Sequence, residues 1–169
     1  MTARVPSLSH GEPYGTIPLW CKGGKRLQEN IIVKPSVEKQ VDRFLRQGRA
    51  LFFSAPCGFG KTAVAEALLS GREVLRLSAD SADFSLPSAE ADWQILLLDD
   101  LQDMQEEQDW NALCELIRTC PDRRFVLLSR GAPPGCLMAF QYTGLMTVLE
   151  ADDLLFDADD VRRLLRLYG

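Results

Sequence analysis

From residue 31 onward, short apolar segments alternate with segments that carry apolar residues at helical spacing. The apolar segments have the length of buried strands and are bounded by polar or turn-forming residues. They predict five strands, at 50–54, 74–77, 95–98, 125–128 and 146–149. The polar stretch 79–92, which contains Pro87, predicts a loop.

Helical patterns fill most of the remaining chain. They predict helices between 36 and 48, over 61–70, around 110–117 and after 157. Ser36 and Asp157 are the expected N-caps of the first and last helices, because their side-chain oxygens can accept free backbone N–H groups. Strands that alternate with helices imply parallel pairing, so the predicted fold class is a three-layer α/β sandwich.

Residues 1–30 differ from the rest of the chain, because prolines and glycines interrupt any period there. We expect a flexible N-terminal arm or linker, which Trp20 could pin to the domain surface, followed by one domain over 31–169. The chain stops at Gly169, directly after the last helical pattern. Either that helix ends there or the chain is a fragment of a longer protein, and we favour the second interpretation.

Composition narrows the class further. The chain has 169 residues, of which 46% are hydrophobic, and this suits one domain with a substantial core. A formal net charge of −5 argues against a domain that coats nucleic acid. Five cysteines include no C-x-x-C pair and His10 is the only histidine, so neither a zinc site nor a disulfide scaffold is expected. No apolar run approaches the roughly 18–20 residues of a membrane span, and we expect a cytoplasmic protein without a membrane partner.

The strongest chemical signal lies between the first predicted strand and the helix over 61–70. Residues 55–62 have the sequence Ala-Pro-Cys-Gly-Phe-Gly-Lys-Thr. It fits the phosphate-binding pattern G-x-x-x-x-G-K-[ST], except that alanine takes the first position. The alternative is a chance match in a glycine-rich turn, which the flanking strand and helix disfavour. The predicted phosphate contacts are Pro56, Cys57, Gly58, Phe59, Gly60, Lys61, Thr62 and Ala63.

Each position of this segment has a chemical reason. Gly58 and Gly60 allow successive N–H groups to turn inward, and the helix that follows directs its positive end at an anion. Lys61 supplies a mobile positive charge for β- and γ-phosphates, and the Thr62 hydroxyl can ligate Mg²⁺. Ala55 lies at the strand end, where φ need not be positive, so alanine is acceptable there.

A second signal is the pair of acids that ends the strand over 95–98. In open α/β folds, ligands bind at the carboxyl edge of the sheet, and this is where Asp99 and Asp100 are expected. We predict that Asp99 holds Mg²⁺ and that Asp100 orients or deprotonates the attacking water. The alternative is a helix cap or a solvated turn.

A third signal is Arg130, which follows the strand over 125–128 at the same expected edge. Its planar, permanently charged guanidinium suits a γ-phosphate, so we include it with Lys61 and Asp100 among the catalytic candidates. The alternative is a surface arginine paired with a nearby acid.

The segment 54–62 resembles the S-A-P-A-G-[FY]-G-K-T loop of the large ATP-binding LuxR-type transcription regulators, which belong to the STAND class of signalling ATPases. Leu98, Asp99 and Asp100 resemble the second motif of that family, and Arg130 matches its arginine after the fourth strand. The residues from Leu145 to Leu165 resemble its characteristic tail. The resemblance covers roughly residues 31–168.

This resemblance implies a P-loop NTPase fold with strand order 2-3-4-1-5. It also implies an ATP/ADP-dependent switch in a signal-responsive transcription regulator, with ATP or ADP and Mg²⁺ as cofactors and slow hydrolysis. The ATP-bound form would self-associate, and DNA would be bound only through a C-terminal helix-turn-helix outside these 169 residues.

Two features depart from the family pattern. The stretch 79–92 is shorter than usual and lacks an apolar period. The family also has a histidine shortly after its acidic pair, whereas this chain has Leu101 and Gln102, so a polar role there would fall to Gln102.

Two other functions stay open. A free-standing P-loop phosphotransferase would need an acceptor pocket and a lid with several arginines, and 79–92 contains none. A module that binds nucleotide without chemistry is disfavoured by the intact Lys61, Thr62, Asp99 and Asp100.

Overall fold

The computed structural model describes residue 31 and residues 33–168, with side chains to residue 166. The arm expected over 1–30, and Trp20 within it, lie outside the described residues. The strands are β1 (Ala50–Ser54), β2 (Val74–Ser78), β3 (Ile95–Asp99), β4 (Arg124–Ser129) and β5 (Met146–Glu150). Each contains a predicted strand and extends it by two residues at most.

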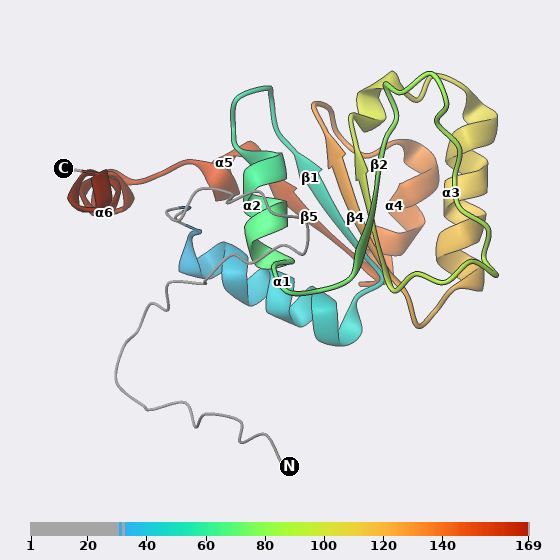
Figure 1. Ribbon diagram of the computed structural model, residues 1–169, viewed down its shortest axis with the longest axis horizontal. Helices are drawn as coiled ribbons and strands as arrows, with labels where there is room; N and C mark the ends of the chain where they lie inside the picture. Colours follow the sequence, from blue (N-terminus) through green and yellow to red (C-terminus); the bar gives the residue numbers. More distant parts are fainter. Residues whose placement is uncertain (1–30, 32, 169) are drawn as a thin grey trace, which may run out of the picture.

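All neighbouring strands run parallel, in the order β2-β3-β4-β1-β5. The chain therefore forms the three-layer α/β sandwich and the strand order expected from the sequence. Figure 1 shows the sheet between two layers of helices, with the carboxyl ends of the strands toward the top. Parallel neighbours require crossover connections, and these place the returning helices on the two faces.

The helices are α1 (Pro35–Gln47), α2 (Lys61–Leu68), the 3₁₀ turn η1 (Leu101–Asp103), α3 (Glu107–Thr119), α4 (Gly135–Tyr142), α5 (Ala151–Leu154) and α6 (Ala158–Tyr168). The turn η1 and the helices α4 and α5 were not predicted. Their short lengths give little room for an apolar period, and α4 buries only Leu137 and Phe140 fully.

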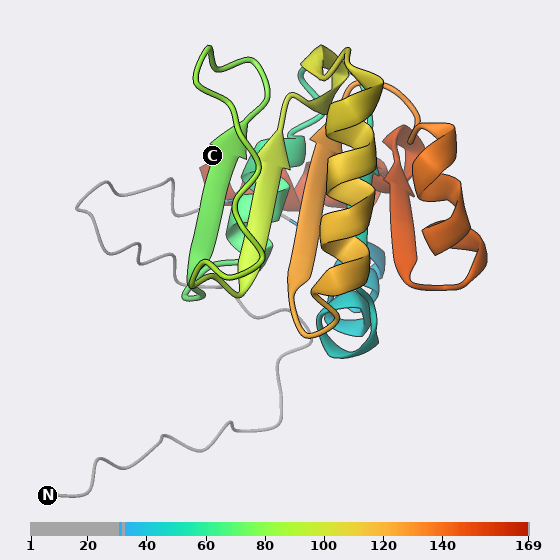
Figure 2. The same cartoon turned by 90° about the vertical axis from the view of Figure 1, so that its right-hand side faces the viewer.

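Successive strand residues point to opposite faces, which gives the domain two cores. On one face Phe52, Leu98 and Leu127 pack with α3 and α4, and on the other Phe53, Leu97 and Leu128 pack with α1 and α2. Figure 2 shows α3 and α4 side by side over their face of the sheet. The central strands are buried on both sides, which explains their continuous apolar sequences.

Two helix ends test the predicted caps. The first helix begins two residues earlier than expected, so Ser36 lies inside it and Lys34 takes the N-cap position. Pro35 favours this start, because its fixed φ and missing N–H suit the first helical turn. The prediction for Asp157 is confirmed: its Oδ1 accepts the backbone N–H groups of Asp159 and Asp160, both at 2.8 Å.

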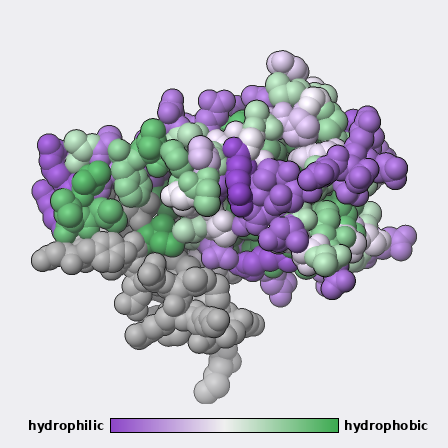
Figure 3. Space-filling view, turned by 90° about the horizontal axis from the view of Figure 1, so that it is seen from above, coloured by the Kyte–Doolittle hydropathy of each residue, from purple (hydrophilic) through white to green (hydrophobic). Residues whose placement is uncertain are grey.

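The last helix has its expected apolar residues, but they do not enter the core. Val161 is 42% exposed and Leu165 is 65% exposed. Figure 1 shows α6 at the end of the molecule, away from the sheet. Seen from above, apolar residues show on this outlying helix, whereas hydrophilic residues gather over the carboxyl edge of the strands (Figure 3).

We expect Phe52→Ala to lower the free energy of unfolding by about 3–5 kcal/mol, because it would leave a cavity in the middle of the sheet. Phe52 is fully buried, at 0% exposure. Urea denaturation measures the change. The control is Tyr142→Ala, at a position that is 82% exposed, where we expect a change within about 0.5 kcal/mol. Equal effects of the two substitutions would contradict the assigned core.

Candidate functional site

The loop between β1 and α2 has the backbone conformation that its glycines permit. Gly58 has φ of 86° and Gly60, the N-cap of α2, has φ of 75°. A Cβ at either position would meet nothing within 4 Å, so the requirement for glycine is conformational rather than steric. Ala55 has no positive φ, which agrees with the expectation that alanine is acceptable there.

Lys61 opens α2 and folds back across the loop. Its Nζ donates to the backbone oxygens of Ala55 at 2.7 Å and Pro56 at 3.0 Å. Both acceptors are neutral carbonyls, so they position the ammonium without cancelling its charge. An anion at the start of α2 would meet this charge together with the free N–H groups of the first helical turn.

The rest of the loop is partly anchored. Phe59 packs against the core that lies under α1 and α2, whereas Pro56 and Cys57 are exposed. Ala63 is half-buried on the first turn of α2. The loop therefore has a fixed base and an exposed rim, an arrangement in which backbone N–H groups can reach a ligand from solvent.

Thr62 and Asp99 come together at the carboxyl edge of the sheet. The Thr62 hydroxyl donates to Asp99 Oδ2 at 2.8 Å, and Asp99 Oδ1 accepts the backbone N–H of Asp100 at 2.8 Å. A hydroxyl beside an oriented carboxylate supplies the hard oxygen donors that Mg²⁺ takes in proteins. This pairing of residues 37 positions apart fits the predicted metal role of both side chains.

Asp100 occupies a left-handed backbone conformation, with φ of 54° and ψ of 37°. Among the described residues it is the one non-glycine residue with positive φ. Aspartate tolerates this region better than most residues. The turn redirects the chain from β3 into η1, and it holds the carboxylate at the edge of the sheet rather than along the strand.

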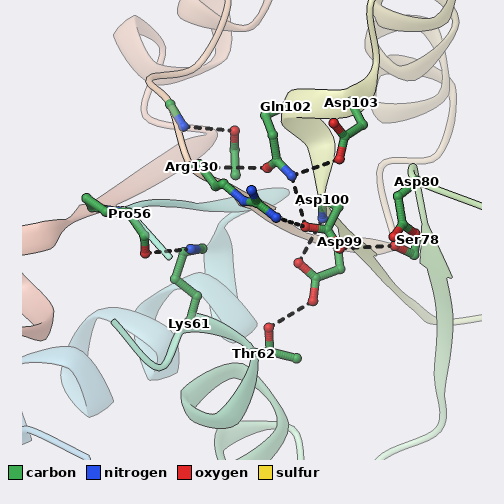
Figure 4. A network of polar contacts seen from close by, with 12 residues as sticks. Pro56, Lys61, Thr62, Ser78, Asp80, Asp99, Asp100, Gln102, Asp103 and Arg130 are labelled. Carbon is green, nitrogen blue, oxygen red and sulfur yellow. Dashed lines mark hydrogen bonds and ion pairs between the residues drawn. The ribbon is translucent and has the colours of Figure 1, made fainter. Parts of the chain in front are cut away.

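The carboxylate of Asp100 accepts from three side chains of three different segments, as Figure 4 shows. Ser78 Oγ lies 3.3 Å from Oδ2, Gln102 Nε2 lies 2.9 Å from Oδ1, and an Arg130 guanidinium nitrogen lies 3.4 Å from Oδ1. Both carboxylate oxygens are therefore engaged. Asp100 is the hub of the polar network at this edge.

Gln102 links two parts of this network through both ends of its amide. Nε2 donates to Asp100 Oδ1 and, at 3.0 Å, to Asp103 Oδ2. Oε1 accepts the backbone N–H of Arg130 at 3.1 Å. The side chain thus joins η1 to the segment after β4, and it does so without a titratable group.

The structure brings the sequence candidates to one edge of the sheet, from the loop after β1 and from the ends of β3 and β4. It pairs Arg130 with Asp100, and not with a carboxylate elsewhere on the surface. Sequence reasoning missed Ser78, whose single hydroxyl proton is shared between Asp80 Oδ1 at 2.6 Å and Asp100 Oδ2 at 3.3 Å. The available signal was that a hydroxyl residue directly follows the predicted second strand, whose carboxyl end lies at this edge.

Comparisons with known proteins agree on the fold. A solved structure of a DNA replication initiation factor aligns with a TM-score of 0.57 and 19% identity, over 83% of this chain and 52% of that chain. The structure of Drosophila ORC bound to DNA aligns with a TM-score of 0.51 and 10% identity, over 99% of this chain and 54% of that chain. This chain thus spans about half the length of each.

Neither a protein-family model nor a curated protein matches the sequence significantly. The strand order and these structural neighbours show a parallel α/β sandwich fold with the strand order 2-3-4-1-5. Within the described part of the chain, no helix is long and apolar enough to cross a membrane.

We expect Lys61→Ala to weaken Mg-ATP binding by at least about 100-fold, because it removes the loop's charged donor and its hydrogen bonds to phosphate. Isothermal titration calorimetry measures the affinity. The control is Lys39→Ala, which removes an exposed lysine of α1 and should leave the affinity unchanged. Equal affinities of parent and Lys61→Ala would show that this loop is not the binding site.

Proposed function

We propose that this domain is an ATP/ADP-dependent switch of a signal-responsive LuxR-type transcription regulator, with slow Mg²⁺-dependent ATP hydrolysis. The observation that carries the proposal is the contact of Arg130 with Asp100, beside the loop that holds Lys61 and Thr62. The sequence resemblance supplies the type of regulator, and the geometry supplies a reason why ATP and ADP would differ.

Different groups of this chain would bind different parts of the nucleotide. The backbone of 56–63 and the Lys61 ammonium would bind phosphates, and Thr62 with Asp99 would hold the metal. Bound Mg-ATP supplies a terminal phosphate that ADP lacks, with a metal ion that offsets its charge. The 2.8 Å contact of Thr62 with Asp99 supports this assignment, because it places the two oxygen donors side by side.

Arg130 is suited to sense the difference between the two nucleotides. Its guanidinium lies 3.4 Å from Asp100 and its side chain is 56% exposed, so the ion pair is held weakly. Its backbone N–H is fixed by Gln102 at 3.1 Å. The guanidinium can therefore exchange one anion for another while its Cα stays in place. A switch requires such a differential contact, because a ligand that binds two conformational states with equal affinity does not shift the equilibrium between them.

The hydrogen bonds that the Asp100 carboxylate accepts are the reason to expect slow hydrolysis. A general base needs a free oxygen within hydrogen-bond reach of the water it activates. Here Gln102 and Arg130 donate to Oδ1, and the Ser78 hydroxyl, which also contacts Asp80, lies 3.3 Å from Oδ2. Loss of the Arg130 contact would remove one of the two hydrogen bonds to Oδ1, and the contacts of Gln102 and Ser78 with the carboxylate would remain. Asp100 would thus act as a restrained base, which suits a switch better than a fast enzyme.

The proposed regulator is larger than this chain. The alignments cover only 52% and 54% of the two solved chains compared above, and the second of these is bound to DNA. DNA contact here is proposed only through a C-terminal helix-turn-helix outside the 169 residues, and self-association is proposed for the ATP-bound form. No feature of the site favours the free-standing phosphotransferase.

We expect Arg130→Ala to lower the affinity for ATP by roughly 10-fold and to leave ADP affinity within about 2-fold, because one charged hydrogen bond to the terminal phosphate is lost. Paired titrations with Mg-ATP and Mg-ADP measure the ratio. The control is Arg72→Ala, an exposed arginine after α2. Equal losses for both nucleotides would remove Arg130 from the sensing role.

A further inference from the structure

Helices α3 and α4 lie side by side on one face of the sheet, in both views of the fold (Figures 1 and 2). Each follows a strand of the parallel sheet and returns from its carboxyl edge, so the two helices run in the same direction. Near their ends, the Arg118 guanidinium lies over the Phe140 ring at 5.5 Å. This contact fixes the register of one helix against the other.

One helical turn earlier, each helix carries a cysteine. Cys114 precedes Arg118 by four residues and Cys136 precedes Phe140 by four. Residues four apart lie on the same face of a helix. When two helices run in the same direction, moving four residues back along both of them leads from one pair of facing residues to another pair. Cys114 and Cys136 thus face each other across the α3–α4 interface. Cys114 belongs to the apolar core on this face of the sheet, and Cys136 packs against that core.

The two thiols differ in their accessibility to solvent. Cys114 is 1% exposed, whereas Cys136 is half-buried. Burial raises the pKa of the Cys114 thiol to about 12, and the neighbouring Cys136 thiol adds to the rise. Because the thiolate is the nucleophile in thiol chemistry, Cys136 is the member of the pair that reacts first.

We propose that Cys114 and Cys136 form a redox modification site, a dithiol that a low-molecular-weight disulfide such as oxidised glutathione converts into a disulfide between α3 and α4. The Cys136 thiolate attacks the oxidant, a mixed disulfide forms, and one glutathione thiolate leaves. Cys114 attacks Cys136 Sγ, the second glutathione leaves, and the Cys114 proton passes to this leaving thiolate. The protein pair loses two electrons and the oxidant gains them.

The bond would tie together the two helices that follow the site. Helix α3 comes after the turn that carries Gln102, and α4 comes after the segment that begins with Arg130. The other described cysteines lie elsewhere: Cys57 is exposed on the loop before α2, and Cys120 is buried at the end of α3. The proposal does not depend on nucleotide binding, so each can fail without the other.

Peptide mapping tests the site directly, because each of the five cysteines falls on a different tryptic peptide. The full chain is incubated with oxidised glutathione under native conditions, free thiols are alkylated, and unreduced peptides are analysed by mass spectrometry. We expect a link between peptides 77–118 and 131–162 that dithiothreitol reverses. A link of 131–162 to 119–123, which carries Cys120, or no link at all, would overturn the proposal.

Single substitutions test the order of the steps. We expect Cys114→Ser to accumulate a glutathione mixed disulfide on Cys136, and Cys136→Ser to leave Cys114 modified at least about 10-fold more slowly. Cys114→Ala serves as a second variant that keeps an apolar side chain at the buried position. Equal modification rates at the two cysteines would contradict the assigned order, and a mixed disulfide that persists on Cys136 of the parent chain would exclude closure of the pair.

Discussion

The position of β4 between β1 and β3 is the constraint on which the site depends. Its register sets Ser129 beside Ser54 on one side and Leu127 beside Leu98 on the other. Parallel pairing brings the carboxyl ends of all three strands to one edge, where the loop after β1, the acids after β3 and Arg130 after β4 converge. Chain segments separated by tens of residues thus form one polar cluster on an apolar base.

Within that cluster, Asp100 is the residue on which the side-chain hydrogen bonds converge. Its left-handed backbone turns the chain into η1, and its carboxylate collects donors from β2, η1 and the end of β4. The donors are unequal: Gln102 at 2.9 Å is firmly placed, and Arg130 at 3.4 Å is half-exposed. The Gln102 contact therefore holds the Asp100 carboxylate in place, and the weaker Arg130 contact is the one that can change. This difference is the physical basis of the proposed switch.

The features that the sequence predicts are those that depend on residues close together in the chain. The strands could be predicted because Phe52, Leu97 and Leu127 belong to continuous apolar runs that are buried on both faces. The loop before α2 could be predicted because glycine, lysine and threonine act there within a few residues. The strand order came from the family resemblance, since the local pattern alone does not fix it.

Contacts between distant segments escaped prediction. Ser78 reaches Asp100 across 22 residues, and Gln102 reaches the backbone of Arg130 across 28. Nothing in the local sequence of either residue marks these partners. Helix α4 was missed for a related reason: its packing against α3 and the sheet stabilises it, and its eight residues are too few for a clear period.

The most direct measurement of the central claim is a crystal structure of the chain grown with Mg²⁺ and a non-hydrolysable ATP analogue. The account predicts the phosphates against the backbone of 56–62, the metal at Thr62 and Asp99, and the Arg130 guanidinium on the terminal phosphate. Gln102 should still hold the Arg130 backbone. Nucleotide bound elsewhere, or Arg130 still paired with Asp100 beside a bound terminal phosphate, would contradict the account.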